Sequence, residues 1–235
     1  MGLALLTGVG REGQVGEAVA QRLAADGHEL ILVDRDTANV EARAASIRAV
    51  GGKAHALSAD LSDPTAVAAL IQAVTSRHGG QLDALVHLAG GFAVTGPVAE
   101  TEIEAWDRQL SINLRTSFLV SRAAIPLLRK KGGSMVFFSS ESALPGAKVA
   151  RISAYTVAKY GVIALATAIS QEERESGIRA NVLAPASIRT GTNVASMPEG
   201  SRFVEREDVA ATVSWLCSDA SSAVTGQVIR LAARK

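Results

Sequence analysis

A tyrosine and a lysine stand four positions apart in the segment SAYTVAKYGV (153–162), whose other residues are mostly small or apolar. On a helix, this spacing places the Tyr155 phenol and the Lys159 ammonium on one face. A phenol has a pKa of about 10 in water, and a nearby ammonium lowers that pKa because it stabilises the phenolate. The pair could therefore exchange a proton with a substrate near neutral pH. The same spacing also arises by chance on helix surfaces, so the surrounding elements decide its meaning.

A glycine-rich loop follows the first apolar run of the chain. Glycines permit positive φ and close approach of a phosphate to backbone N–H groups, and a helix N-terminus adds further donors. The pattern G-x-G-x-x-G is typical of dinucleotide binding, although a purely structural turn could share it. The next apolar run ends in Asp34, whose carboxylate could accept hydrogen bonds from an adenosine ribose or simply be solvated in a turn. The loop glycines are Gly8, Gly10, Gly13 and Gly16.

Strand-like runs alternate with helical patterns along the whole chain. We expect strands at 3–7, 29–34, 53–60, 82–89, 134–140, 178–184 and 227–231. We expect helices at 15–26, 37–50, 64–77, 102–130 (with an interruption), 153–175 and 207–217. This order predicts an α/β fold, a Rossmann-like doubly wound parallel sheet of about seven strands with helices on both faces. One dinucleotide-binding domain, residues 1–235, would carry both the cofactor and the substrate sites.

Composition narrows the functional classes. The formal net charge is +1, which argues against nucleic acid or an anionic membrane as the main partner. The single Cys217 cannot form an internal disulfide, so a reducing, cytoplasmic location is expected. No apolar run approaches the roughly 20 residues that span a bilayer, and the apolar start is interpreted as a strand rather than a signal peptide.

Taken together, the motifs resemble those of the short-chain dehydrogenase/reductase family over nearly the whole length. Tyr155 and Lys159 match its Tyr-x-x-x-Lys, and Asn113 matches its helix asparagine. The resemblance implies hydride transfer between a secondary alcohol or ketone and NAD(P). In that mechanism Tyr155 moves the proton, Lys159 lowers the tyrosine pKa and binds the nicotinamide ribose, and Asn113 supports a water. Ser140 or Ser142 would position the substrate oxygen.

The resemblance also implies a cofactor surface at the carboxyl ends of the strands. ADLSD (59–63) would contact the adenine, LAG (88–90) matches the end of the family's Asn-Asn-Ala-Gly, and GIRANVLAPASIRT (177–190) would hold the nicotinamide side. The implied cofactor-binding residues are Thr7, Gly8, Gly10, Gly13, Val15, Gly16, Asp34, Arg35, Asp60, Leu61, Ala89, Gly90, Tyr155, Lys159, Pro185, Ile188 and Thr190.

Several departures from the family pattern leave details open. The glycine loop has two extra residues, so Gly10 or Gly13 could meet the pyrophosphate. His87 and Leu88 replace the Asn-Asn pair, and we expect His87 to tie strands together rather than to act in catalysis. Asp34 favours NAD because it would repel a 2′-phosphate, whereas Arg11 and Arg35 could pair with that phosphate and favour NADP.

The choice between the two serines depends on how the family is aligned. The usual distance to the tyrosine points to Ser142, whereas the strand ending MVFFSS points to Ser140. We favour Ser140, because strand register is fixed by what each face buries and loops tolerate insertions.

Two rival functions remain open: a 3-oxoacyl-carrier-protein-type ketoreductase and a non-catalytic dinucleotide-binding sensor or scaffold. LRKKGG (128–133) is interpreted as a helix C-terminus, since its charges suit the dipole and glycine stops the helix; it could otherwise be an acyl-carrier docking patch. The substrate, apart from being a small carbonyl or alcohol, is not defined, and residues 191–206 are expected to form a short lid. The resemblance implies a homodimer or homotetramer, because helices 102–130 and 153–175 correspond to those that build the interface in this family. His28, His55 and His78 lack metal-ligand spacing, so no metal is predicted.

Overall fold

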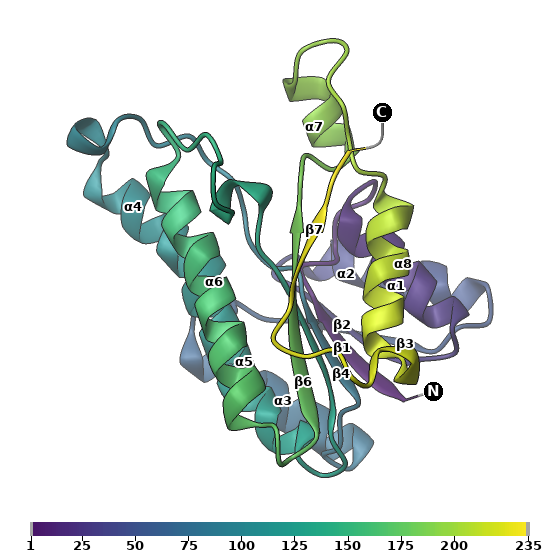
Figure 1. The fold of residues 1–235 in the computed structure, drawn as a ribbon. Helices are drawn as coiled ribbons and strands as arrows, with labels where there is room; N and C mark the ends of the chain where they lie inside the picture. Colours follow the sequence, from purple (N-terminus) through teal and green to yellow (C-terminus); the bar gives the residue numbers. More distant parts are fainter. Residues whose placement is uncertain (1, 234–235) are drawn as a thin grey trace.

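The computed structural model describes residues 2–233, which form one seven-stranded parallel sheet between two layers of helices (Figure 1). The spatial order is β3-β2-β1-β4-β5-β6-β7. Because the chain runs outward from β1 and then returns to add β4 on its other side, the switch point lies between those two strands. The strands are β1 (Leu3–Thr7), β2 (Glu29–Asp34), β3 (Ala54–Ser58), β4 (Ala84–His87), β5 (Gly133–Phe138), β6 (Ile178–Pro185) and β7 (Val228–Leu231).

Helices cover both faces of the sheet. One buried cluster joins α1, α2 and α8 to the sheet, and a second joins α3, α5 and α6 to the opposite face. The helices are α1 (Val15–Ala25), α2 (Thr37–Ala49), α3 (Pro64–His78), α4 (Ile103–Leu110), α5 (Thr116–Leu128), α6 (Ser153–Glu172), α7 (Gly191–Ser196) and α8 (Arg206–Cys217). Along β2, Leu30 and Leu32 face the first layer while Ile31 and Val33 face the second, as alternation along a strand requires.

Helix α3 shows how local chemistry sets element boundaries. The Asp63 side chain accepts a hydrogen bond from the N–H of Thr65 at 2.9 Å, and Pro64 occupies the first helical position, where no N–H is needed. At the other end, Gly79 adopts φ +70°, a left-handed conformation that stops the helix. His78 is therefore fixed as the last helical residue.

The predicted fold class and all seven predicted strands are confirmed, with shifts at the ends. β5 stops at Phe138, so Ser139 and Ser140 follow the strand instead of belonging to it. The predicted helix 102–130 is divided into α4, a π-helical segment (Ser111–Arg115) and α5. The short helix α7 lies inside the segment expected to form a lid. Within residues 2–233, no helix has the length and apolarity to cross a membrane.

Candidate active site

Helix α6 begins at the carboxyl edge of the sheet and carries Tyr155 and Lys159 on one face. The Lys159 side chain is buried, and its Nζ donates a hydrogen bond to the backbone oxygen of Phe138, the last residue of β5, at 2.9 Å. The same Nζ lies 5.8 Å from the centroid of the Tyr155 ring. Ser139 secures the helix against the strand, since its Oγ donates to the Lys159 oxygen at 2.9 Å.

Burial controls the proton affinities of both groups. It lowers the pKa of Lys159 to about 8, and it raises the pKa of Tyr155, against a smaller lowering by a hydrogen bond with Ser140. Desolvation of the phenolate is the largest influence on the Tyr155 pKa, and the hydrogen bond with Ser140 opposes it. That Lys159 lowers the tyrosine pKa stays a prediction. An ammonium whose own pKa is near 8 also loses part of its charge above neutral pH.

The structure separates Ser140 from Ser142. Ser140 is extended, with φ −153° and ψ 152°, and the hydrogen bond that affects the Tyr155 pKa comes from its side chain. A 3-10 turn begins at Glu141, so extension does not continue to Ser142. Ser142 instead contacts Ser140: its Oγ and its N–H donate hydrogen bonds to the Ser140 Oγ at 3.1 and 3.2 Å.

The π-helical segment places Asn113 at the end of β4. Its side-chain oxygen accepts from the N–H of Gly91 at 3.1 Å, and its Nδ2 donates to the Gly91 oxygen at 2.9 Å and to the Gln109 oxygen at 3.1 Å. A Cβ added to Gly90 would lie 2.6 Å from Asn113 Oδ1 and 3.3 Å from Lys159 Nζ. Gly90 is thus required where Asn113 and Lys159 approach the strand end.

His87 ties the central strands to the helix layer, as predicted. Its Nδ1 lies 2.9 Å from the Thr7 hydroxyl on β1, and its Nε2 lies 3.3 Å from the Thr116 hydroxyl on α5. Thr116 itself donates to the Ile112 oxygen at 3.0 Å, so the network assigns the proton of the ring to Nε2. Burial, with a smaller contribution from the Lys159 charge, lowers the pKa of His87 to about 3, which keeps the ring neutral.

The glycine loop packs tightly between β1 and α1. Gly8 has φ +76°, and a Cβ there would lie 2.6 Å from the Ala89 nitrogen; a Cβ on Gly16 would lie 2.6 Å from the Gly8 oxygen. Gly13 also has a positive φ, and its N–H donates to the Glu17 carboxylate at 2.7 Å. No side chain caps the start of α1. First-turn N–H groups without a side-chain cap are suited to an anion, so this end of the loop fits a dinucleotide phosphate.

Asp34 ends β2 directly beside that loop. Its carboxylate accepts from the N–H of Gly10 and of Arg35, both at 2.8 Å, so the loop fixes its position. Arg35 is exposed, and its charge helps to lower the pKa of Asp60, after two stronger hydrogen bonds from Ser62. Leu61, next to Asp60, is buried.

The segment after β6 is tethered at several points. Pro185 ends the strand, and Ile188 forms an isolated parallel bridge with Val204. The Thr190 hydroxyl caps α7 by accepting from the Asn193 N–H at 3.2 Å. Gln14 of the glycine loop donates to the Thr192 hydroxyl at 3.3 Å. The predicted cofactor-binding residues after β6 therefore lie in a segment that contacts the glycine loop.

Phe92 is a site neighbour that sequence reasoning missed. Its ring meets Tyr155 edge-on with 5.1 Å between centroids, and the residue is 63% exposed. It directly follows Gly90 and Gly91, so an aromatic residue after this strand end was the available signal. The exposed Phe92 ring therefore forms part of the surface beside the phenol.

Known proteins match this chain over nearly its whole length. A family model described as enoyl-(acyl carrier protein) reductase matches residues 8–232. Inactive 2-(S)-hydroxypropyl-CoM dehydrogenase 2 of Xanthobacter autotrophicus is 34% identical over 86% of this chain and 92% of its own length. A solved structure of a short-chain type dehydrogenase/reductase from Mycobacterium ulcerans has a TM-score of 0.90 and 32% identity, covering 98% of this chain and 88% of that one.

A Mycobacterium tuberculosis relative, (5R,7aS)-5-hydroxy-7a-methyl-1-oxo-2,3,5,6,7,7a-hexahydro-1H-indene-carboxyl-CoA reductase, is 33% identical over 227 residues, or 92% of this chain and 86% of its own length. Fold and relatives together define an oxidoreductase built on a Rossmann-like sheet. Within that class, the chain belongs to the short-chain dehydrogenase/reductase family, whose members generally use NAD or NADP.

Proposed function

We propose that the protein interconverts a secondary alcohol and a ketone with a nicotinamide cofactor, using Tyr155 as proton donor and acceptor. The observation that carries the proposal is the hydrogen-bonded pair of Tyr155 and Ser140 beside the buried Lys159. A bound nicotinamide supplies or accepts the hydride at the carbonyl carbon. The phenol, raised in pKa by burial, is protonated near neutral pH and can donate to the developing alkoxide.

The other three residues have supporting roles in this proposal. The Ser140 hydroxyl donates to the substrate oxygen as negative charge develops there. Lys159 presents an ammonium near the phenol and the cofactor ribose. Asn113, held by the backbone of Gly91 and Gln109, keeps the turn of the helix open beside Lys159, where a water could exchange protons with solvent.

We propose NAD as the preferred cofactor. The first turn of α1 would hold the pyrophosphate, and Asp34 would accept from the adenosine ribose. Asp34 is fixed by two backbone N–H groups, whereas Arg35 is exposed and its charge acts on Asp60. A fixed carboxylate beside the ribose repels a 2′-phosphate. This arrangement supports NAD more strongly than the exposed arginines support NADP.

A thioester-linked carbonyl is the second candidate substrate, because the matching family model is described as an acyl-carrier-protein reductase and one relative is named a CoA reductase. The basic segment 128–133 lends no support to carrier docking at this site. Arg129 pairs with Glu173, and Lys131 pairs with Asp83 at the amino edge of the sheet, opposite the active site.

A substrate screen tests the proposal against the non-catalytic alternative. Purified protein would be mixed with NADH or NADPH and with a panel of free ketones, cyclic diketones and β-ketoacyl-CoA thioesters. Turnover would be followed as a decrease in the absorbance of the reduced nicotinamide. Turnover that disappears in Tyr155→Phe supports the proposal. Cofactor binding without turnover on any substrate class would support a sensor or scaffold instead.

We further propose a homo-oligomer built on α4, α5 and α6. Apolar side chains that are exposed in the single chain lie on these helices, among them Ile103, Phe118, Val157 and Tyr160, and exposed apolar patches mark interaction surfaces. Light scattering coupled to gel filtration measures the mass of the particle in solution. We expect the mass of a dimer or tetramer, and the mass of a monomer would contradict this proposal.

A further inference from the structure

The amino edge of the sheet holds a cluster that the oxidoreductase chemistry does not use. Glu29 begins β2, His55 lies on β3 and His78 ends α3. His55 pairs with Ile31 in the parallel register, and Glu29 shares the face of Ile31 because side chains alternate. That face is the one α3 covers. Three elements far apart in sequence therefore bring their side chains to one place.

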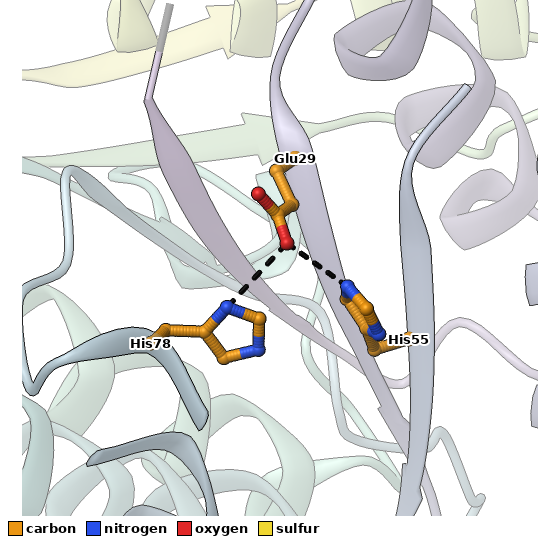
Figure 2. Close-up of side chains that lie close together, drawn as sticks. All are labelled: Glu29, His55 and His78. Carbon is orange, nitrogen blue, oxygen red and sulfur yellow. Dashed lines mark hydrogen bonds and ion pairs between the residues drawn. The ribbon is translucent and has the colours of Figure 1, made fainter. Parts of the chain in front are cut away.

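The contacts within the cluster are short. His55 Nε2 lies 2.9 Å from Glu29 Oε1, and His78 Nδ1 lies 3.4 Å from the same oxygen. All three candidate ligand atoms lie within 4.8 Å of one another. Figure 2 shows both imidazole rings directed at the Glu29 carboxylate. Two ligands of a tetrahedral zinc ion, each about 2.0–2.2 Å from the metal, lie roughly 3.4 Å apart, so small side-chain rotations suffice.

We propose that Glu29, His55 and His78 bind one Zn²⁺ ion per chain. Two imidazole nitrogens and one carboxylate oxygen are a recognised zinc donor set that leaves a fourth position for water. Within residues 2–233, the ion-pair partners of Glu29 are these two histidines, with no lysine or arginine competing for its charge.

Access to the cluster suits an exchangeable ion. The side chains of Glu29, His55 and His78 are 35%, 44% and 13% exposed. Glu29 and His78 also line a cavity of about 340 Å³ with Leu3, Gln81 and Asp83. Asp83 is already engaged, since it accepts from the Leu3 N–H at 2.6 Å and pairs with Lys131 at 2.6 Å. The cavity beside Glu29 and His78 therefore leaves room for a water as the fourth ligand.

A bound ion would tie β2, β3 and α3 together at the edge opposite the active site. Because the cluster exists only in the folded chain, zinc should raise folding stability by mass action. At a free concentration 100 times the dissociation constant, the midpoint of thermal unfolding should rise by about 5–10 °C.

The test uses the full chain without a histidine tag, stripped with chelator and desalted. Zinc binding would be measured by calorimetry, with Co²⁺ as a spectroscopic probe, because four-coordinate Co²⁺ absorbs strongly in the visible. We expect one ion per chain. His55→Gln and His78→Gln should each weaken binding by more than about 100-fold, beyond what loss of an outer-shell partner causes.

His28→Gln is the matched control. His28 precedes Glu29 in the chain, yet its Nδ1 contacts the Gly2 oxygen at 3.2 Å and it is not part of the cluster. The control should bind zinc as the unaltered chain does. The proposal fails if the unaltered chain takes up no zinc, or if His28→Gln weakens binding as much as His55→Gln. If a histidine variant does not fold, Glu29→Gln takes its place in the Co²⁺ titration. The proposal expects the visible absorption to be lost in this variant, and unchanged absorption would contradict it.

Discussion

At the carboxyl edge of the sheet, Lys159 and His87 are buried and bonded to backbone or threonine oxygens. At the amino edge, the side chains of Glu29 and His55 are more than a third exposed, that of His78 is less so, and both histidines contact Glu29. Burial at the first edge shifts proton affinities by large amounts. Exposure at the second leaves ligand atoms accessible to an ion. The two proposals thus assign proton transfer to the buried edge of the sheet and cation binding to the more exposed edge.

Replacing Tyr155 should have the largest effect on the reaction rate. It tests whether the buried carboxyl edge of the sheet transfers the proton. Tyr155→Phe should reduce kcat by about 10²–10⁴-fold, because it removes the general acid while leaving the ring against Phe92. The chain's other tyrosine is the control: Tyr160 lies on the same helix but is 58% exposed. Steady-state rates of Tyr160→Phe should stay within about twofold of the unaltered enzyme. Equal losses in both variants would remove Tyr155 from the mechanism.

Removing the two serine hydroxyls gives the next largest effect. Ser140→Ala should lose about 10²–10³-fold in kcat, as expected for a donor to a developing oxyanion. Ser142→Ala should lose much less, since its hydroxyl supports Ser140 and not Tyr155. Both variants would be assayed with saturating cofactor. A large loss confined to Ser142→Ala would reverse the assignment.

Cofactor choice should change by a smaller factor. Asp34→Asn keeps an oxygen near the loop but removes the charge that repels a 2′-phosphate. The ratio of kcat/KM for NAD over NADP should fall by about 10–100-fold, the range expected for one hydrogen bond to a charged group. Arg11→Gln, which removes from the same loop a charge that could pair with a 2′-phosphate, is the comparison and should not lower this ratio. An unaltered enzyme that already prefers NADP would contradict the ribose role of Asp34.

The burial of His87 should make the free energy of unfolding depend on pH in the acid range. The ring protonates at about pH 3 in the folded chain and near pH 6.5 when unfolded, so the unfolded state binds one more proton between these values. Stability should therefore fall with decreasing pH across this window, by about 1.4 kcal/mol per pH unit from this group. Urea unfolding of the unaltered chain and of His87→Asn, compared between pH 7 and pH 4.5, measures it. Parallel stability curves would show that His87 does not carry this effect.

Much of the fold could be predicted because strand runs and helix periods are local signals. The strands of residues 3–7 and 29–34 and the serine, tyrosine and lysine motifs were all readable from the sequence. An interruption of the helix 102–130 was predicted, but its π-helical form around Asn113 was not, because the hydrogen-bond shift leaves the apolar pattern nearly unchanged. The cluster of Glu29, His55 and His78 was missed for another reason. Strand register and the position of Gly79 bring these residues together, and spacing along the chain carries neither.

The π-helical segment has a consequence for the relative phase of α4 and α5. A π turn holds one residue more than an α turn, and an α-helix rotates by about 100° per residue. Ser111–Arg115 therefore sets the angle between the face of α4 and the face of α5 that packs on the sheet. Deleting one residue there would force a choice: either Leu119 and Val120 rotate off the sheet, or Asn113 turns away from Gly91. Catalytic geometry and core packing are thus linked through a single inserted residue.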